Sequence, residues 1–447
     1  MEPEILRISE THIRILTIDQ AVSWGEEVYS PRLHQNCMNP ENITLYPLEI
    51  EWNGDKVTVS DHYGMKKWIT GEKVTGNSRL EFKTEKIKNV ILAETVEDVR
   101  KRKKRGKIMN YSECIENART RIGNYCKACP ECNGRACKNQ MPGPGAKGIG
   151  DTAIRNYDKW KEIRVQMDTI AENKLVDTSL ELFGKKFLYP FFAGPVGAVG
   201  LHYGDCLDDV RYNDILVSAC AKYGIAAFTG DGLDSNVMVA ATKAIGKTDG
   251  IGIPTVKPWN IDTVAEKMKM VQESKAFAVA MDVDAAGLPF LKNMEPPAGS
   301  KTVEELGEIA KIAGIPFIVK GVMTVRGALK AKEAGASAIV VSNHGGRVLD
   351  QCPATAEVLE EIARAVGDSM KIFVDGGIRS GVDVFKALAL GADAVIIARP
   401  FVTAVYGGAE EGVKSYIDKI GTELEDTMKM CGVTSLKEIT RASVWMK

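Results

Sequence analysis

From residue 187 onward, short and nearly continuous apolar runs alternate with amphipathic stretches. Runs of this kind predict strands that are buried on both faces of a parallel sheet. The eight runs are FLYPFFAGPVG (187–197), GIAAFTGD (224–231), IGIPTVKPW (251–259), AFAVAMDVD (276–284), PFIVKGV (316–322), AIVVSNHGG (338–346), KIFVDGG (371–377) and AVIIARP (394–400). Stretches such as TVEELGEIAKIAG (302–314) and GVDVFKALALGA (381–392) lie between most of them and predict helices. Eight strand–helix units predict an α/β fold, a TIM barrel over residues 151–447.

The residues before the barrel divide into three predicted parts. Residues 1–98 form a small module, expected to be β-rich because LEIEWNGDKVTVS (48–60) alternates apolar and polar residues around Asn53-Gly54, a hairpin-turn dipeptide. Residues 99–108 contain the basic run RKRKKR and are interpreted as a solvated linker. Residues 109–150 form a cysteine-rich connecting segment. No function is assigned to the first module.

Charge narrows the class of partner. The 447 residues include 58 Lys and Arg against 59 Asp and Glu, so net charge gives no reason to expect nucleic acid or an anionic membrane surface as the partner. A small-molecule ligand is expected instead.

The sequence contains no apolar run long enough to span a membrane, and its first residues lack a signal-peptide pattern, so a cytoplasmic protein is predicted. A homo-oligomer is also expected.

Cysteine is concentrated in one stretch. The segment CKACPECNGRAC reads C-x2-C-x2-C-x4-C and supplies Cys126, Cys129, Cys132 and Cys137. Thiolates at these spacings suit a soft metal, and the first three spacings are similar to those of bacterial ferredoxins. Both a zinc site and an iron–sulfur cluster fit the spacing, and a metal site is favoured over free thiols.

Polar residues stand where the predicted strands end. A TIM barrel builds its active site at the C-terminal ends of its strands, so these side chains are expected to converge. They are Lys257, Asp282, Asp284, Lys320, His344, Arg347, Asp375 and Arg399. Strands seven and eight end in DGGIRSG (375–381) and ARP (398–400), where Gly376 and Gly377 allow backbone N–H groups to approach a phosphate closely. Together with Arg379 and Arg399, they predict a phosphorylated ligand.

The motifs SNHGGRVLD and DGGIRSG, in this order and at these strand ends, resemble the FMN-dependent 2-hydroxy acid oxidase and dehydrogenase family, which includes glycolate oxidase, lactate oxidase and flavocytochrome b2. The resemblance covers roughly residues 150–447. It implies FMN as cofactor and oxidation of an L-2-hydroxy acid, such as lactate or glycolate, to the 2-oxo acid.

The resemblance also implies roles for individual residues. His344 matches the active-site base, Asp284 the carboxylate that orients it, Arg347 the arginine that binds the substrate carboxylate, and Lys320 the lysine beside the flavin N1–C2 edge. The remaining residues that match cofactor contacts are Ala193, Gly194, Pro195, Ser342, Asp375, Gly376, Gly377, Arg379, Ala398 and Arg399.

The sequence departs from the family pattern around the substrate. Lys257-Pro258-Trp259 stands where the family has Gln-x-Tyr, and VDAAGLP (283–289) lacks the family's second carboxylate-binding arginine. Lys257 and Trp259 are therefore predicted to contact the substrate, with Lys257 as a point charge in place of the arginine fork. The family tyrosine expected near MPGPGAKGIGD (141–151) is also missing.

Several alternatives stay open at this point. The electron acceptor is oxygen, a quinone or an electron-transfer protein. A type 2 isopentenyl diphosphate isomerase-like FMN enzyme is one rival, although a base triad of His344, Arg347 and Asp284 has no purpose there. A flavin-binding redox sensor or electron carrier is the other, distinguished by holding FMN without oxidising a small acid.

Overall fold

The computed structural model describes residues 109–447, apart from 173, 289–290, 292–297 and 447, together with seven strands among residues 5–83. The predicted basic linker, residues 99–108, lies outside the described residues. The chain separates into two compact units, Met1–Ile108 and Met109–Lys447.

The described part of the first unit consists of antiparallel strands. Five of them form one sheet in the order β1-β2-β5-β6-β7, and β3 pairs with β4. Their bounds are Ile5–Ser9 (β1), His12–Ile15 (β2), Val22–Trp24 (β3), Glu27–Tyr29 (β4), Leu48–Asn53 (β5), Lys56–Ser60 (β6) and Arg79–Lys83 (β7). The predicted hairpin is present, because β5 and β6 pair antiparallel with Asn53 opposite Lys56.

The second unit is built on eight parallel strands in the order β11-β18-β17-β16-β15-β14-β13-β12. Their bounds are Phe191–Ala193 (β11), Phe228–Thr229 (β12), Ile253–Val256 (β13), Val279–Asp282 (β14), Phe317–Val322 (β15), Ala338–Val341 (β16), Lys371–Val374 (β17) and Ala394–Ile397 (β18). A parallel bridge between Ala193 and Ala227 links the two ends of the sheet. Each strand falls within one predicted apolar run, so the predicted TIM barrel is confirmed.

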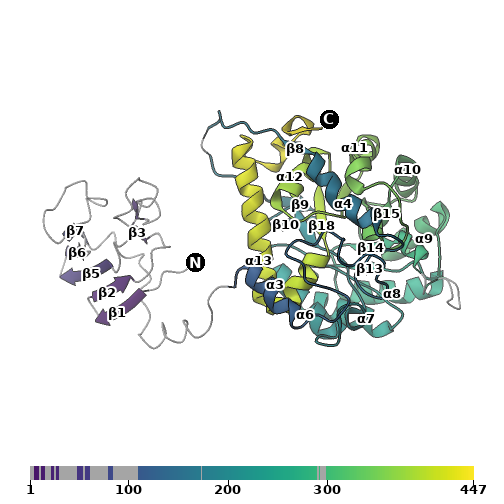
Figure 1. The fold of residues 1–447 in the computed structure, drawn as a ribbon, viewed down its shortest axis with the longest axis horizontal. Helices are drawn as coiled ribbons and strands as arrows, with labels where there is room; N and C mark the ends of the chain where they lie inside the picture. Colours follow the sequence, from purple (N-terminus) through teal and green to yellow (C-terminus); the bar gives the residue numbers. More distant parts are fainter. Residues whose placement is uncertain are drawn as a thin grey trace. The chain divides into compact units, whose positions relative to one another are not determined.

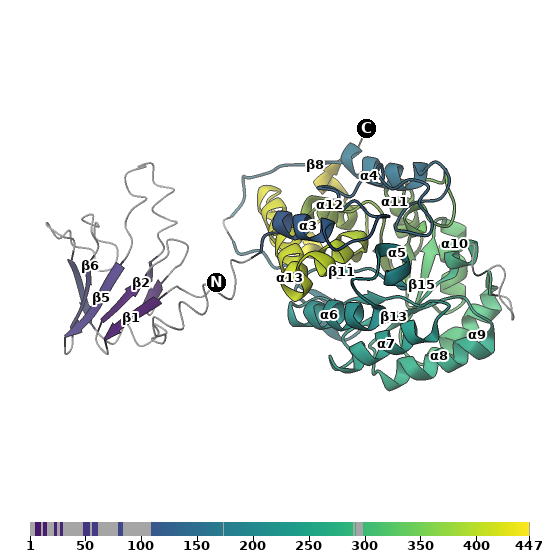
Figure 2. The same cartoon turned by 60° about the horizontal axis from the view of Figure 1, so that its bottom comes forward.

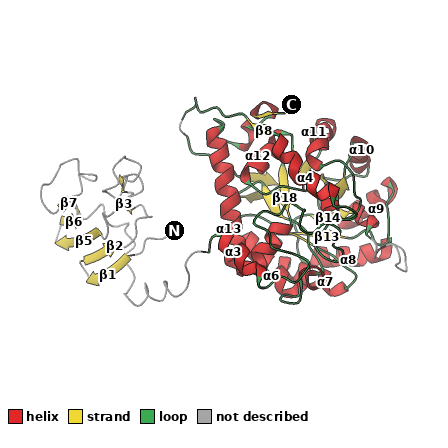
Figure 3. Cartoon of the chain, in the orientation of Figure 1, coloured by secondary structure: helices red, strands yellow, loops and turns green. Residues whose placement is uncertain are grey.

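Helices surround this sheet (Figures 1 and 2). Those that follow the strands are α6 (Asp209–Lys222), α7 (Ser235–Gly246), α8 (Ile261–Glu273), α9 (Val303–Ala313), α10 (Val325–Glu333), α11 (Thr355–Val366), α12 (Gly381–Ala389) and α13 (Arg399–Met430). Their ends follow local chemistry: Thr302 and Glu305 form a capping box at the start of α9, and Gly314 ends that helix in the left-handed region. Figure 3 shows the strands enclosed by helices.

Aromatic side chains fill the inside of the barrel. The rings of Phe192, Phe228 and Phe373 contact one another edge-on or tilted, with centroids 5.7–6.5 Å apart. All three are fully buried. The barrel is therefore a packed core, which leaves the strand ends as the place for a ligand.

Additional elements cover the barrel. Helix α3 (Tyr111–Arg119) packs against α13, and α4 (Asp151–Glu162) packs against α11. The other short elements are α5 (Val199–Tyr203), β8 (Arg164–Val165), which pairs with β19 (Val444–Trp445), and β9 (Leu180–Leu182), which pairs with β10 (Lys185–Phe187). Among the described residues, no helix is both long enough and apolar enough to cross a membrane.

Candidate active site

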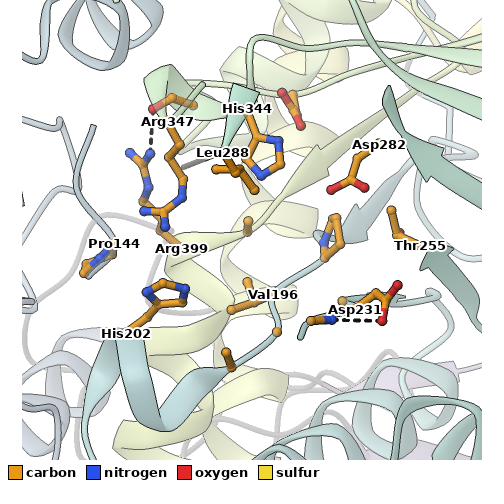
Figure 4. Close-up of a pocket in the computed structure, with 18 of the residues that line it drawn as sticks. Pro144, Val196, His202, Asp231, Thr255, Asp282, Leu288, His344, Arg347 and Arg399 are labelled. Carbon is orange, nitrogen blue, oxygen red and sulfur yellow. Dashed lines mark hydrogen bonds between the residues drawn. The ribbon is translucent and has the colours of Figure 1, made fainter. Parts of the chain in front are cut away.

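A cavity of about 410 Å³ lies at the C-terminal ends of the barrel strands (Figure 4). Most of the residues predicted for the site line it. They are Pro195, Lys257, Lys320, His344, Arg347, Asp375, Gly376, Gly377, Arg379, Ala398 and Arg399. Ala193, Gly194, Trp259, Asp284 and Ser342 do not line the cavity. The residues at the strand ends therefore converge on one cavity, as a TIM barrel requires. The five predicted site residues that do not line the cavity lie outside its lining.

His344 is held against Asp284 by an unusual loop. Its Nδ1 lies 3.0 Å from Asp284 Oδ1, and its backbone N–H donates to Ser342 Oγ at 3.1 Å. His344 adopts φ +56°, and Gly345 and Gly346 also have positive φ. A non-glycine residue in this region is strained, and such strain is common at functional sites. The glycine pair thus turns the chain sharply enough for the imidazole to enter the cavity.

Burial sets the protonation of this pair. It lowers the pKa of His344 despite the opposing charge of Asp284, so the imidazole is neutral near pH 7. Burial opposes ionisation of Asp284, but His344 and Lys320 outweigh it and lower the pKa of this carboxyl. A neutral imidazole hydrogen-bonded to a carboxylate through Nδ1 leaves Nε2 free to accept a proton.

Lys320 is a buried cation at the end of β15, with 3% of its surface exposed. Its Nζ donates to Ser342 Oγ at 2.9 Å and lies 3.3 Å from Asp375 Oδ2. Burial opposes its charge, but Asp375, Asp284 and Asp282 raise the pKa of Lys320. The ammonium is therefore a fixed positive charge in the lining of the cavity.

Lys257 and Trp259, which stand where the family has substrate contacts, differ in whether they line the cavity. Lys257 lines the cavity, but its Nζ lies 2.5 Å from Asp282 Oδ2, so its charge is already paired. Trp259 points elsewhere: its Nε1 donates to Asp231 Oδ2 at 2.6 Å, and Lys267 also pairs with Asp231. The indole does not line the cavity itself, but it bonds to a buried carboxylate that does.

Arg347 is held in place by backbone carbonyl groups. Its Nη1 donates to Gly143 O at 2.5 Å and to Gly145 O at 3.0 Å, which leaves other guanidinium N–H groups for a ligand. Burial, with Arg399 nearby, lowers the pKa of Arg347 to about 10, so it remains charged near neutrality. Figure 4 shows Arg347 and Arg399 side by side on one wall of the cavity.

His202 on α5 lines the same wall and was missed from sequence (Figure 4). Its Nδ1 accepts the backbone N–H of Gly143 at 3.1 Å. Burial, together with the charges of Arg347 and Lys257, lowers its pKa to about 4. The sequence signal was weak: His202 follows the first strand by several residues and belongs to no motif.

The predicted phosphate-binding end has two arginines with different orientations. Arg399 Nη2 donates to Gly345 O at 2.7 Å. Arg379 lines the cavity too, but its Nε donates to Cys132 O at 2.6 Å. Gly377 has φ +81°, and a Cβ there would lie 2.1 Å from the Asn156 carbonyl oxygen. Glycine is therefore required at this position to let α4 pack against the loop after β17.

The four predicted metal ligands surround a second cavity, of about 380 Å³. Cys126, Cys129, Cys132 and Cys137 all line it, and none forms a disulfide. Within the described part of the chain, the one group of three or more potential metal ligands with all donor atoms within 4.8 Å of each other is Asp282, Asp284 and His344. No three of the four sulfur atoms lie that close together.

Comparison with known proteins identifies the family. The model of the FMN-dependent dehydrogenase family matches residues 144–294 and 267–446. The chain belongs to this family, and the predicted resemblance is confirmed.

Individual similar proteins agree with this assignment. A peroxisomal (S)-2-hydroxyacid oxidase of Arabidopsis thaliana is 48% identical over 136 residues, which is 30% of this chain and 38% of that protein. Glycolate oxidase 3 of Oryza sativa subsp. indica is 49% identical over 133 residues, 30% of this chain and 36% of that protein. The chain thus matches less than two fifths of the length of these relatives. Because the Arabidopsis relative is described as peroxisomal, the cytoplasmic location stays a prediction.

Solved structures extend the likeness over more of the chain. A flavocytochrome b2 variant with sulfite bound shares 26% identity and a TM-score of 0.58, covering 66% of this chain and 79% of that one. A mandelate oxidase shares 22% identity and a TM-score of 0.62, covering 76% of this chain and 98% of that one, which supports the fold alone.

Proposed function

We propose that this protein uses FMN to oxidise an L-2-hydroxy acid of the lactate or glycolate type to the 2-oxo acid. The observation that carries the proposal is the contact between His344 Nδ1 and Asp284 Oδ1 at 3.0 Å beside the buried cation Lys320. Loss of the hydroxyl proton and the α-hydrogen together with two electrons requires a base, a carboxylate anchor and an electron acceptor in one place.

The cavity fits FMN in its size and in its unpaired polar groups. Asp375 Oδ1 and Thr255 Oγ1 are buried at the strand ends without a hydrogen-bond partner among the described residues, and both residues line the cavity. Unsatisfied buried polar atoms of this kind indicate a missing polar partner. Lys320 would hold the ring end of the cofactor, and Gly376, Gly377 and Arg399 the phosphate end. When bound, FMN supplies the acceptor for two electrons.

Residues of the chain bind the substrate, remove its proton and stabilise the charges that develop. Arg347 binds the substrate carboxylate with the guanidinium N–H groups that Gly143 and Gly145 leave free. His344 takes a proton from the substrate at Nε2, because Nδ1 faces Asp284. As the imidazole becomes positive, the Asp284 carboxylate stabilises it. Lys320 provides a preorganised positive charge for the negative charge that develops as electrons leave the substrate.

The substrate pocket is simpler than the family pattern. Lys257 is neutralised by Asp282, and Trp259 is bonded to Asp231, so neither is free to replace the missing carboxylate-binding groups. Arg347 is the main anchor, and His202 lies on the same wall as a neutral hydrogen-bonding group. Leu288 lines the cavity and offers an apolar surface to the side chain of the hydroxy acid. A small substrate with one carboxylate suits this set.

The test is anaerobic bleaching of the flavin by a panel of 2-hydroxy acids that includes L-lactate and glycolate. We expect one of them to bleach the wild-type flavin, and we expect His344→Ala to retain FMN while losing bleaching by the acid. Dithionite is the control, because it should bleach the flavin of both proteins. Bleaching by the acid in His344→Ala would contradict the assignment of the base. A wild-type flavin that no acid bleaches would contradict the oxidation itself and favour the isomerase or sensor hypothesis.

A further inference from the structure

The second cavity combines four thiols with two arginines at the edge of the first. Cys126, Cys129, Cys132 and Cys137 come from the loop after α3, and α13 contributes Tyr416 to the lining. Pro144, Arg379 and Arg399 line both cavities. The two spaces are therefore neighbours, separated by the residues that stand at the predicted phosphate end of the first.

The spacing of the sulfur atoms distinguishes the two kinds of metal site. A tetrahedral zinc ion with Zn–S bonds of about 2.3 Å would draw its four sulfurs to about 3.8 Å from one another. No three of the four sulfurs lie within 4.8 Å of each other. A cuboidal cluster of four irons places its four cysteine ligands farther apart, one on each iron, and therefore needs the wider arrangement.

Charge and hydrogen bonding also favour an anionic occupant. Arg379 Nη2 donates to Cys132 Sγ at 3.7 Å, and its Nε donates to the carbonyl oxygen of the same residue at 2.6 Å. Tyr416 lines the cavity with 1% of its surface exposed, and its hydroxyl has no hydrogen-bond partner among the described residues. A buried hydroxyl without a partner is uncommon unless a further polar group occupies the site.

We propose that the cavity lined by Cys126, Cys129, Cys132 and Cys137 binds a [4Fe–4S] cluster, which carries electrons from the flavin to a one-electron acceptor protein. This electron relay, from the flavin through the cluster to the acceptor, rests on the proposed function, whereas the cluster site does not. Oxidation of one R-CHOH-COO⁻ to R-CO-COO⁻ releases two electrons and two protons. Two successive one-electron transfers through the cluster reduce two molecules of oxidised acceptor, and the protons pass to solvent.

The first experiment measures the cluster without turnover. The full chain is purified anaerobically, and iron, acid-labile sulfide, zinc and FMN are determined per chain. We expect about four irons and four sulfides, and an electron paramagnetic resonance signal after reduction by dithionite. Cys132→Ser should lose most of the iron, whereas Cys206→Ser should keep it, because Cys206 is exposed and lies outside the cavity. If Cys132→Ser does not fold, wild-type protein stripped by a chelator and reconstituted with ferrous iron and sulfide gives the same measurement.

Two results would overturn the site: one zinc per chain without sulfide, or no iron after reconstitution. The relay is tested separately with oxidised cytochrome c as the probe acceptor and an acid that bleaches the flavin. Cytochrome c reduction should fall at least tenfold in Cys132→Ser while bleaching persists; equal rates in the two proteins would overturn the relay. Failure of every acid to bleach the wild-type flavin would count against the proposed function, and iron, sulfide and the dithionite-reduced spectrum would still decide the cluster.

Discussion

Replacing Asp284 with Asn tests how the buried pair assists proton removal. The change keeps the size of the side chain and an oxygen that can accept from His344 Nδ1, so it removes mainly the negative charge. Neutral His344 gains little from that charge before the reaction. The gain appears when the imidazole takes a proton, so the loss is expected in the rate of flavin reduction rather than in FMN binding.

The magnitude follows from the geometry. With Nδ1 and Oδ1 3.0 Å apart, the two charge centres lie about 4 Å apart, where unit charges at an effective dielectric constant of about 20 attract by about 4 kcal/mol. Each ~1.4 kcal/mol changes a rate tenfold. The rate of flavin reduction should therefore fall about a thousandfold in Asp284→Asn.

Anaerobic stopped-flow absorbance across a pH series measures this effect. The acidic limb reports protonation of His344, whose pKa burial lowers and Asp284 raises. Removal of the carboxylate should lower this pKa further and move the limb to lower pH. Asp393→Asn is the matched control, because Asp393 pairs with Lys371 at the opposite ends of the strands. A decrease of less than tenfold, or an acidic limb that does not move, would refute the reasoning.

Two further predictions concern stability. Lys257→Met leaves the Asp282 carboxylate buried and unpaired, which should lower the free energy of unfolding by about 3–5 kcal/mol in urea denaturation at pH 7. Because burial raises the pKa of Asp282, this loss of stability should shrink as the pH falls and the carboxyl is protonated. A loss that does not depend on pH would contradict this account. Gly377→Ala forces a Cβ to 2.1 Å from the Asn156 oxygen, whereas Gly335→Ala, at nearly the same φ, meets nothing within 4 Å. The first should cost roughly 1–3 kcal/mol more than the second, and equal costs would show that φ alone matters.

The barrel followed from the sequence because its strands are buried on both faces. Such strands leave short apolar runs that end in polar residues, and each run ends close to where its strand does. The role of a strand-end residue was harder to predict because it depends on its neighbour across the sheet. Lys257 follows β13, and its partner Asp282 ends the next strand, β14. From sequence, both were candidates for the cavity, and nothing indicated that they would neutralise each other.

The surroundings of residues away from the strand ends were harder to predict for a related reason. His202 reaches the cavity from α5, whose position depends on how the chain returns over the barrel mouth. Trp259 directly follows a strand-end segment, yet its indole turns toward Asp231. The spacing of the cysteines predicted a ligand set, but the chain order did not indicate that Arg379, after β17, would contact Cys132.

The loop after the cysteines connects the two cavities mechanically. Its carbonyl groups at Gly143 and Gly145 hold Arg347, and the backbone N–H of Lys147 donates to Gly346 O at 2.9 Å, within the turn that carries His344. A displacement of this loop would therefore act on both Arg347 and the turn that carries His344 through these backbone contacts. A cysteine variant must therefore be judged by flavin bleaching as well as by iron content. Loss of the proposed cluster alone should spare bleaching, whereas displacement of the loop should weaken the hold on Arg347 and slow bleaching.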